Sequence, residues 1–473
     1  MPLCMSSSEP ATVSSSALEQ PDRFRTIWKL AYPIVLSGVA QNAIDIADTA
    51  FMGHYSQVAL GAMAIVALIY FGLITAGMGL ATGAQILIAR ADGRGEHALT
   101  GRLFRHSLVL FGALALLAFG LARTSDAWLL GRLLENEAVR DAGLAYLDIR
   151  LFGIFFAMGN LAFRGLYIGL GRSRLILYTT FAMAAINIAL NTVLIFGYFG
   201  FPAMGIRGAA LASVIAEGVT LVLFLAYTVT AFPHAHYGLF GRLRLEQSLL
   251  GAILGKGAPI AIQQMISMAG FTYFFVLIEQ MGAVELAASN VLRSIYLVFI
   301  LPIIGFGTAV NTLVSNALGQ GKLEAARRAV SRSVMLSFGF TLLLVPVQVI
   351  FPEAILSFYT NDPEVIAAGQ EPLWVLASAL LMFSVSFILF SGISGMGDTL
   401  VYSTIEITTV MIYLSYLYVL LERGLEDLTI AWTAEWVFMG LMGVWSWLYL
   451  RFYGWKRQQL KLNNLANTLN GCI

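Results

Sequence analysis

Cysteine and charge are both scarce in this sequence of 473 residues. The two cysteines, Cys4 and Cys472, lie near opposite ends of the chain, which excludes a disulfide framework and a thiolate metal site. Only 12% of the residues are charged, and the formal net charge is +1. A balance this close to zero argues against nucleic acid as a partner.

Sequence signatures of catalysis are also missing. The chain contains no nucleophile elbow, no HExxH zinc motif and no phosphate-binding GxxxxGK(S/T) loop. We therefore expect no enzyme, no cofactor and no resident metal. Without a domain that hydrolyses ATP, active transport by such a chain must draw its energy from an ion gradient.

Apolar residues, by contrast, are abundant. They make up 58% of the chain, and the mean hydropathy of +0.79 lies well outside the range of soluble globular proteins. Apolar stretches of about 20 residues, long enough to span a bilayer, occur at 30–53, 59–88, 103–122, 145–170, 175–199, 206–231, 257–280, 285–317, 331–351, 372–395, 400–421 and 429–450. The sequence therefore predicts an all-α polytopic membrane protein with twelve transmembrane helices.

Polar segments divide the chain. Residues 1–25 are Ser-rich and lack an apolar core, which is typical of a disordered cytoplasmic tail and not of a cleavable signal peptide. The connection 232–255 carries His234 and His236, but no further candidate ligands lie nearby, so a metal site is not indicated. We predict an N-lobe at 26–231, a cytoplasmic linker at 232–255, a C-lobe at 256–453 and a cytoplasmic C-terminal tail at 454–473.

The basic residues predict the orientation in the membrane. If the N-terminus is cytoplasmic, nearly all Lys and Arg residues between the spans fall on the cytoplasmic side. The opposite loops hold only five, namely Arg123, Arg132, Arg140, Arg207 and Arg423. This asymmetry follows the positive-inside rule, so we expect a multi-pass protein of the plasma (inner) membrane with both termini in the cytoplasm.

An internal repeat organises the whole chain. A constant offset of 226 residues, without a gap, pairs Pro33 with Pro259, Gly93 with Gly319 and Gly171 with Gly397. Six spans return the chain to its starting side, so the two halves repeat in the same orientation as two six-helix lobes. Transporters built from such parallel repeats bind substrate between the halves and alternate access by rocking one half against the other.

Two carboxylates lie inside the first apolar span. Asp45 and Asp48 belong to the stretch 33–54, PIVLSGVAQNAIDIADTAFMGH, and the repeat matches them with Phe271 and Phe274. An Asp at the centre of a transmembrane helix costs about 2.5–3.5 kcal/mol, so such a residue is by default functional. Three residues apart, the two acids share a helix face, so they can serve one site. The alternative is that both reach headgroup water near the helix end.

Asparagines and a further acid lie in the fifth and sixth spans. Asn187 and Asn191 are four residues apart, so they stack on one helix face. Their amide oxygens can be cation ligands or hydrogen-bond partners for Asp48, if the fifth span packs beside the first. The alternative is that the two asparagines only hold helices together. Glu217 in the sixth span has a transport role or makes a structural hydrogen bond in protonated form.

The remaining polar residues within the spans are candidates for a central cavity. Glu406 and Glu435 raise the same question as Glu217. We expect Arg164 and Arg293 to pair with these acids; the alternatives are that they snorkel to the interface or contact an anionic substrate. The predicted cavity residues are Gln41, Asn42, Tyr70, Asn160, Glu217, Gln263 and Gln264.

Several motifs together resemble one family of membrane transporters. ADTAFMGH ends the first span, GLATGAQILIARADGRG follows the second, NIALNTVLIFG lies in the fifth and GAALASVIAE in the sixth. GLGRSR and GMGDTL follow the fourth and tenth spans, and the second half contains VLRSIYLVFILPIIGFGTAVNTLVSNALGQGKLEAARRAV. Over nearly the whole chain this pattern resembles the multidrug and toxic compound extrusion (MATE) transporters. The contexts of Glu217 and of the Asp48–Thr49 pair favour the DinF-like branch over the NorM-like branch.

The resemblance implies two six-helix lobes forming a V and export of drugs coupled to Na⁺ or H⁺. By position, Asp48 matches the family's carboxylate for the coupling ion, and Asn187 matches an asparagine of the same N-lobe site. Asn191 stands where relatives often have a second aspartate, and Ala209 stands where they have a threonine ligand. We therefore expect protonation of Asp48 in preference to Na⁺ binding at Asp48, Asn187 and Asn191, with Asp45 as a further source of negative charge.

These observations predict a secondary active multidrug antiporter. A proton that binds Asp48 from outside neutralises the carboxylate and releases substrate, and substrate entering from the cytoplasm favours the deprotonated form. We expect small cationic or amphiphilic substrates, H⁺ or Na⁺ as the coupling ion, the lipid bilayer as surroundings and a monomer. The alternative is a lipid or glycolipid flippase of the same wider superfamily, which requires a strongly cationic cavity; only Arg164 and Arg293 qualify for one.

Overall fold

The computed structural model describes Leu18 and residues 20–424 and 427–470, and this part of the chain contains helices and no strands. The predicted disordered tail lies mostly outside the described residues. Eleven helices are long and apolar enough to cross a membrane, and the pair α4 (Glu137–Arg150) and α5 (Gly153–Gly169), bent by 50°, makes a twelfth span. The predicted all-α fold of twelve spans is thereby confirmed.

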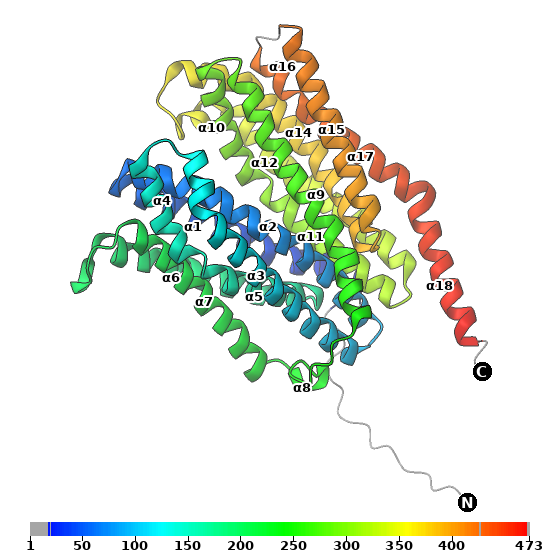
Figure 1. Cartoon of the computed structure of the whole chain (residues 1–473). Coiled ribbons are helices and arrows are strands. Elements are labelled where there is room, and N and C mark those ends of the chain that lie inside the picture. Colours follow the sequence, from blue (N-terminus) through cyan, green and yellow to red (C-terminus); the bar gives the residue numbers. More distant parts are fainter. Residues whose placement is uncertain (1–17, 19, 425–426, 471–473) are drawn as a thin grey trace, which may run out of the picture.

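The helices fall into two groups along the chain (Figure 1). The first half contributes α4 and α5 together with α1 (Phe24–Tyr55), α2 (Gln57–Gly93), α3 (His97–Leu133), α6 (Ser173–Phe196) and α7 (Ile206–Thr230). The short α8 (His234–Tyr237) lies in the predicted linker, and α9 (Gln247–Glu279) begins within it. The second half continues with α10 (Ala283–Phe299), α11 (Leu301–Gly319), α12 (Leu323–Ile350), α13 (Pro352–Ser357), α14 (Pro363–Gly395), α15 (Thr399–Glu422), α16 (Leu428–Trp432), α17 (Ala434–Tyr449) and α18 (Trp455–Asn470).

The sequence repeat reappears in the backbone. Gly95 and Gly321 both have φ +73°, and Gly171 and Gly397 have φ +72° and +77°. These are left-handed conformations that glycine adopts without a Cβ penalty, so each pair ends equivalent helices with the same turn. The halves differ in where helices break: α14 is continuous where the first half has α4 and α5. Helices α2 and α3 are continuous where the second half has α10 and α11, and α12 and α13.

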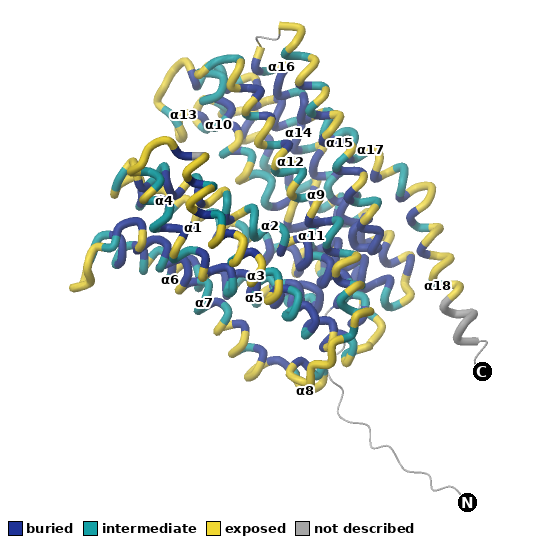
Figure 2. Tube along the Cα trace, in the orientation of Figure 1, coloured by how far each residue is buried: buried dark blue, intermediate teal, exposed yellow. Residues whose placement is uncertain are grey.

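The two lobes meet through α1 and α2 on one side and α9 and α11 on the other. A Cβ on Gly83 would lie 2.5 Å from the backbone nitrogen of Gly257, and one on Gly79 would clash with the backbone of Ala261. In α11 every residue from Asn311 to Leu318 is buried, and Figure 2 shows the dense buried zone around this helix. Helices α2 and α11 finish at Gly93 and Gly319 on the same side of the molecule, and we call this side the closed end.

Candidate functional site

A hydrogen-bonded chain of polar side chains crosses the interior of the first lobe. Helix α6 packs between α1 and α7, and Nδ2 of Asn191 on α6 donates to the carboxylate of Asp48 on α1. The same amide group donates to Oδ1 of Asn187 at 3.1 Å, and Nδ2 of Asn187 donates to the hydroxyl of Ser213 on α7 at 3.2 Å. The structure therefore brings Asp48, Asn187 and Asn191 together, as predicted if the two spans pack side by side.

Asp48 has no positive partner in this network. Among the described residues no Lys, Arg or His nitrogen lies within ion-pair distance of its carboxylate. Both asparagines are at most 1% exposed, and Oδ1 of Asn191 is buried without a hydrogen-bond partner. A carboxylate held only by a neutral amide in the membrane is costly, so the site favours a species that neutralises it: a proton, or a cation that also takes the free amide oxygen.

A second cluster lies one helical turn along α7 from Ser213. The carboxylate of Glu217 forms a two-pronged ion pair with Arg150 at the end of α4, with N–O distances of 2.6 and 2.9 Å. The hydroxyl of Tyr70 on α2 accepts from Arg150 at 2.9 Å and donates to Glu217 at 3.3 Å. Arg150 and Glu217 are 12% and 14% exposed, so this is a largely buried, satisfied pair that ties three helices together.

The break between α4 and α5 makes room for this ion pair. A Cβ on Gly153 would lie 2.6 Å from Oε2 of Glu217 and 3.0 Å from the hydroxyl of Tyr70, and it would clash with the Arg150 guanidinium. On the same helix, Nδ2 of Asn160 donates to the backbone carbonyl of Glu217 at 3.0 Å. Thus Tyr70, Asn160 and Glu217, predicted as cavity residues, are joined to one another in a structural cluster.

The other predicted residues of α1 lie beside the network and not in it. Asp45 is exposed, and in the described part of the chain no hydrogen bond joins it to Asn187 or Asn191. Gln41 and Asn42, one to two turns before Asp48, are half-buried. The geometry therefore separates the two acids: Asp48 is half-buried and hydrogen-bonded in the network, and Asp45, one turn earlier, is exposed.

Gln263 and Gln264 lie on α9, in the other lobe. Nε2 of Gln263 donates to the hydroxyl of Ser267 at 3.2 Å, and Ser267 donates to Glu406 on α15 at 2.7 Å. Ser267 and Glu406 line a cavity of about 250 Å³ whose other walls are mostly aromatic. The amide oxygen of Gln264 is buried without a partner. These two glutamines therefore form no part of the Asp48 network.

The equivalent place in the second lobe is filled by aromatic rings. Phe274, the repeat mate of Asp48, is fully buried and stacks on Tyr413, the mate of Asn187, with ring centroids 5.9 Å apart. Leu417 takes the place of Asn191 and is also fully buried. The hydroxyl of Tyr413 donates to Glu435 at 3.3 Å. At these three positions the first lobe thus carries an acid and two amides, and the second carries Phe, Tyr and Leu, with Glu435 as the acid bonded to Tyr413.

Arg164 and Arg293 do not pair with these acids. In the described residues neither has a carboxylate within ion-pair distance, and Arg293 instead lies over the ring of Phe275, 5.1 Å from its centroid. The expectation that they pair with Glu217, Glu406 or Glu435 is therefore wrong, because Arg150 already occupies Glu217 and the other two acids bond to hydroxyl groups.

Two residues of these clusters, Arg150 and Ser213, were not predicted from the sequence. Arg150 gives no local signal, since its partner is 67 residues away. Ser213 was detectable: it lies one turn from both Ala209 and Glu217 on α7, so it shares their helix face. The Ser213 hydroxyl accepts from Asn187. Ala209, one turn earlier, has no hydroxyl to offer.

Two repeated lobes of six spans, each with a carboxylate that has no basic partner among the described residues, are typical of a multi-pass membrane transporter. The chain belongs to the MatE family, whose model matches residues 33–193 and again residues 259–419. The starts and the ends of the two matches are both 226 residues apart, which confirms the repeat. The finer assignment to the DinF-like branch stays a prediction.

Known relatives and structures agree with this assignment. The chain is 30% identical to "Probable multidrug resistance protein NorM" of Agrobacterium fabrum, over 82% of this chain and 83% of that protein. A protein of the same name from Rhizobium meliloti is 28% identical, over 80% and 82%.

Solved structures support the same fold. The one titled "Outward-facing conformation of a multidrug resistance MATE family transporter of the MOP superfamily" matches with a TM-score of 0.85 at 18% identity, covering 97% of this chain and 99% of that one. A MOP superfamily transporter from Pyrococcus furiosus matches with a TM-score of 0.84 at 18% identity, covering 97% and 100%. At such low identity these two structures bear on the fold alone.

Proposed function

We propose that this protein is a secondary active multidrug efflux antiporter, which exports cationic or amphiphilic compounds in exchange for H⁺, or for Na⁺. The observation that carries the proposal is the Asp48 carboxylate, which is half-buried in the first lobe, accepts from a neutral amide and has no cation within ion-pair distance among the described residues. The relatives' names support a role in multidrug resistance.

Asp48 acts as the coupling switch. A charged carboxylate in the lobe interior is unfavourable, so the empty site takes up a proton, or a cation, from the outside. Neutralisation weakens the hydrogen bond that Asn191 donates to the carboxylate. Helices α1 and α6 then rearrange, and the exported compound is released. A cationic substrate that binds from the cytoplasm favours the charged carboxylate, so Asp48 releases its proton.

The two candidate ions use the same residues differently. A proton needs only one oxygen of Asp48. Na⁺ needs several oxygen ligands, which Asp48, Asn187 and Asn191 supply because one amide oxygen is free. Ala209 offers no hydroxyl, and Ser213 is committed to Asn187, so protonation is the simpler assignment.

The experiment is transport of a fluorescent organic cation in proteoliposomes, with a pH gradient and a Na⁺ gradient imposed separately. We expect the pH gradient to drive efflux by the wild type and Asp48→Asn to abolish it. Asp45→Asn is the matched control, because it removes an exposed carboxylate one turn away, and it should retain most of the activity. Export against a gradient by Asp48→Asn would refute the switch.

The flippase alternative predicts a different phenotype. Arg150 is neutralised by Glu217, so within the spans of the two lobes Arg164 and Arg293 remain as cations for lipid phosphates. Drug resistance conferred on a pump-deficient host supports the antiporter. Loss of a cell-envelope lipid on deletion, without a change in drug resistance, would support the flippase.

A further inference from the structure

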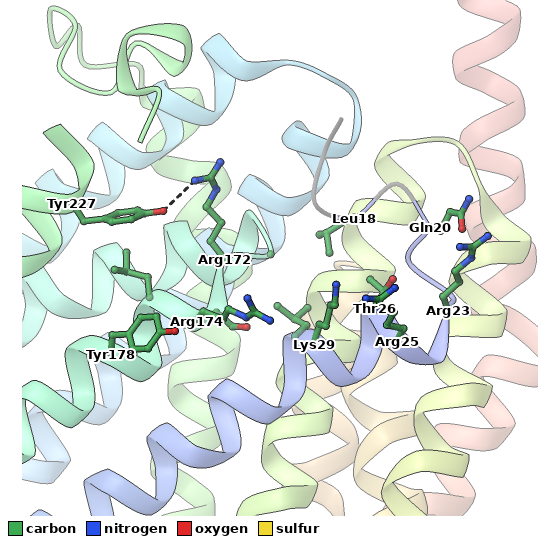
Figure 3. Close-up of a pocket in the computed structure, with 14 residues that line it drawn as sticks. Leu18, Gln20, Arg23, Arg25, Thr26, Lys29, Arg172, Arg174, Tyr178 and Tyr227 are labelled. Carbon is green, nitrogen blue, oxygen red and sulfur yellow. Dashed lines mark hydrogen bonds between the residues drawn. The ribbon is translucent and has the colours of Figure 1, made fainter. Parts of the chain in front are cut away.

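A large basic pocket lies at the closed end, away from the Asp48 network. Its volume is about 760 Å³, and its walls come from the start of α1, the α5–α6 turn and the described residues just before α1 (Figure 3). Among the described residues, no Asp or Glu lines it, and five cationic side chains do: Arg23, Arg25, Lys29, Arg172 and Arg174.

These cations have no carboxylate partner in the part of the chain that the structure describes. Among the described residues no carboxylate lies within ion-pair distance of any of the five. Arg172 donates to the hydroxyl of Tyr227 at 3.2 Å and lies over the ring of Phe232, 4.7 Å from its centroid. These contacts hold the guanidinium in place without an ion pair, so its remaining N–H groups can bind an anion.

Backbone and hydroxyl donors point to the same chemistry. The lining includes the first turns of both α1 and α6, whose free N–H groups and helix dipoles favour a negative group. Ser173, in the first turn of α6, is 1% exposed, and its hydroxyl has no hydrogen-bond partner. A phosphate, with several acceptor oxygens and a negative charge, satisfies both sets of donors.

The surroundings indicate a lipid as the source of that phosphate. Tyr178 lines the pocket and is 66% exposed, and Trp28 on α1 is 44% exposed. Exposed Trp and Tyr at helix ends mark the level of lipid headgroups. Basic pockets between helices on the cytoplasmic side of a membrane protein are suited to anionic lipid headgroups.

We propose that this basic pocket binds the phosphate of an anionic phospholipid from the cytoplasmic leaflet. The inference rests on the proposed membrane orientation and not on the identity of the exported compound or the coupling ion. A pocket of this size accommodates a phosphate with its glycerol, since small-molecule sites have volumes of about 300–1,000 Å³.

The bound lipid favours the closed form of the cytoplasmic side. Leu18, which lines the pocket, packs on Gly171 of the first lobe, and its carbonyl accepts from Gln320 of the second lobe at 3.1 Å. Asp22 pairs with Arg328 and Arg332 on α12. The pocket is therefore complete only while this segment bridges the two lobes, and a ligand that binds one state better shifts the equilibrium toward it.

The test uses the purified full chain in neutral detergent, titrated with short-chain phosphatidylglycerol or phosphatidylcholine. Bound lipid is counted by native mass spectrometry, and the melting temperature is followed in parallel. Arg172→Gln/Arg174→Gln is compared with Arg242→Gln/Arg244→Gln in the linker, which removes the same Arg-x-Arg charges from exposed positions. Arg25→Gln/Lys29→Gln is a second pocket variant, because Arg172 also supports the fold.

We expect retention of phosphatidylglycerol over phosphatidylcholine, and a rise in melting temperature with the anionic lipid only. Each pocket double variant should bind phosphatidylglycerol about 25-fold more weakly, since each cation near an anionic lipid contributes about fivefold, and the linker variant should match the wild type. Equal binding of both lipids, or equal weakening in the linker variant, would overturn the proposal. Stabilisation by inorganic phosphate as strong as by phosphatidylglycerol would overturn the lipid assignment and leave a soluble phosphate site.

Discussion

Gly93 and Gly319 meet where the two lobes join, and the sequence repeat makes them equivalent. A Cβ on Gly319 would lie 3.2 Å from the Cα of Gly93 and would clash with the carbonyl of Arg90. A Cβ on Gly93 would clash in the same way with the carbonyl of Asn316, the repeat mate of Arg90. The contact is thus symmetric, and the pseudo-twofold axis that relates the lobes passes between these two glycines.

Gly319→Ala should weaken this junction. The added methyl group has only backbone atoms to displace, and overpacking of a close contact costs about 1–3 kcal/mol. We expect a lower melting temperature of the purified protein. Gly112→Ala on α3 is the control, because a Cβ there meets nothing within 4 Å. Equal melting temperatures for the two variants would show that the lobes separate easily enough to accept a side chain.

Asn191→Leu tests the donor that holds Asp48. Leucine is the residue at the equivalent place in the second lobe, where it is fully buried, so we expect the fold to survive. Loss of a hydrogen bond to a charged group costs about 1.5–3 kcal/mol, and coupled efflux should fall by about tenfold or more in the proteoliposome assay. Thr192→Val, whose hydroxyl bonds only within its own helix at 2.9 Å, should transport normally. Unchanged efflux by Asn191→Leu would remove the asparagine from the coupling site.

The fold was more predictable than the contacts within it. Long apolar runs and the 226-residue offset are local or periodic signals, so they predict the spans and the two lobes. The approach of Asn191 to Asp48 was also foreseeable, because a membrane acid needs a polar neighbour. The ion pair of Arg150 and Glu217 was not, since it depends on the break before Gly153 and on how three helices rotate.

Glu217→Gln should destabilise the first lobe strongly. It leaves the Arg150 guanidinium, 12% exposed, without its carboxylate, and breaking a buried pair on one side costs about 3–5 kcal/mol. Arg150→Met/Glu217→Leu should lose less than either single variant, because it removes both charges. Melting temperatures of the three variants give the coupling directly. Glu137→Gln is the control, because it breaks the exposed pair of Arg140 and Glu137 and should leave the melting temperature unchanged. An equally small effect of Glu217→Gln would show that the pair of Arg150 and Glu217 has no structural role.

Asp22→Asn should release the segment before α1 from the second lobe. Burial acts to raise the pKa of Asp22, but the hydrogen bond and charge of Arg328, aided by Arg332, outweigh it and hold the pKa below the ordinary 3.8. A lowered pKa in the folded state means that this carboxylate contributes stability above pH 3.8 and loses it as the pH falls through the lowered value. The attachment should therefore persist from pH 5 to 8.

A spin label at Gln20→Cys, with Cys4 and Cys472 replaced by Ser, reports the attachment. The label should be immobile at pH 7 in the otherwise unchanged protein and mobile at every pH when Asp22→Asn is added. Glu96→Gln, which breaks an exposed ion pair with Arg94, is the control and should leave the label immobile. An immobile label with Asp22→Asn would mean that the backbone contacts alone, from Arg332 to the Asp22 carbonyl at 2.7 Å and from Gln320 to Leu18, hold the segment.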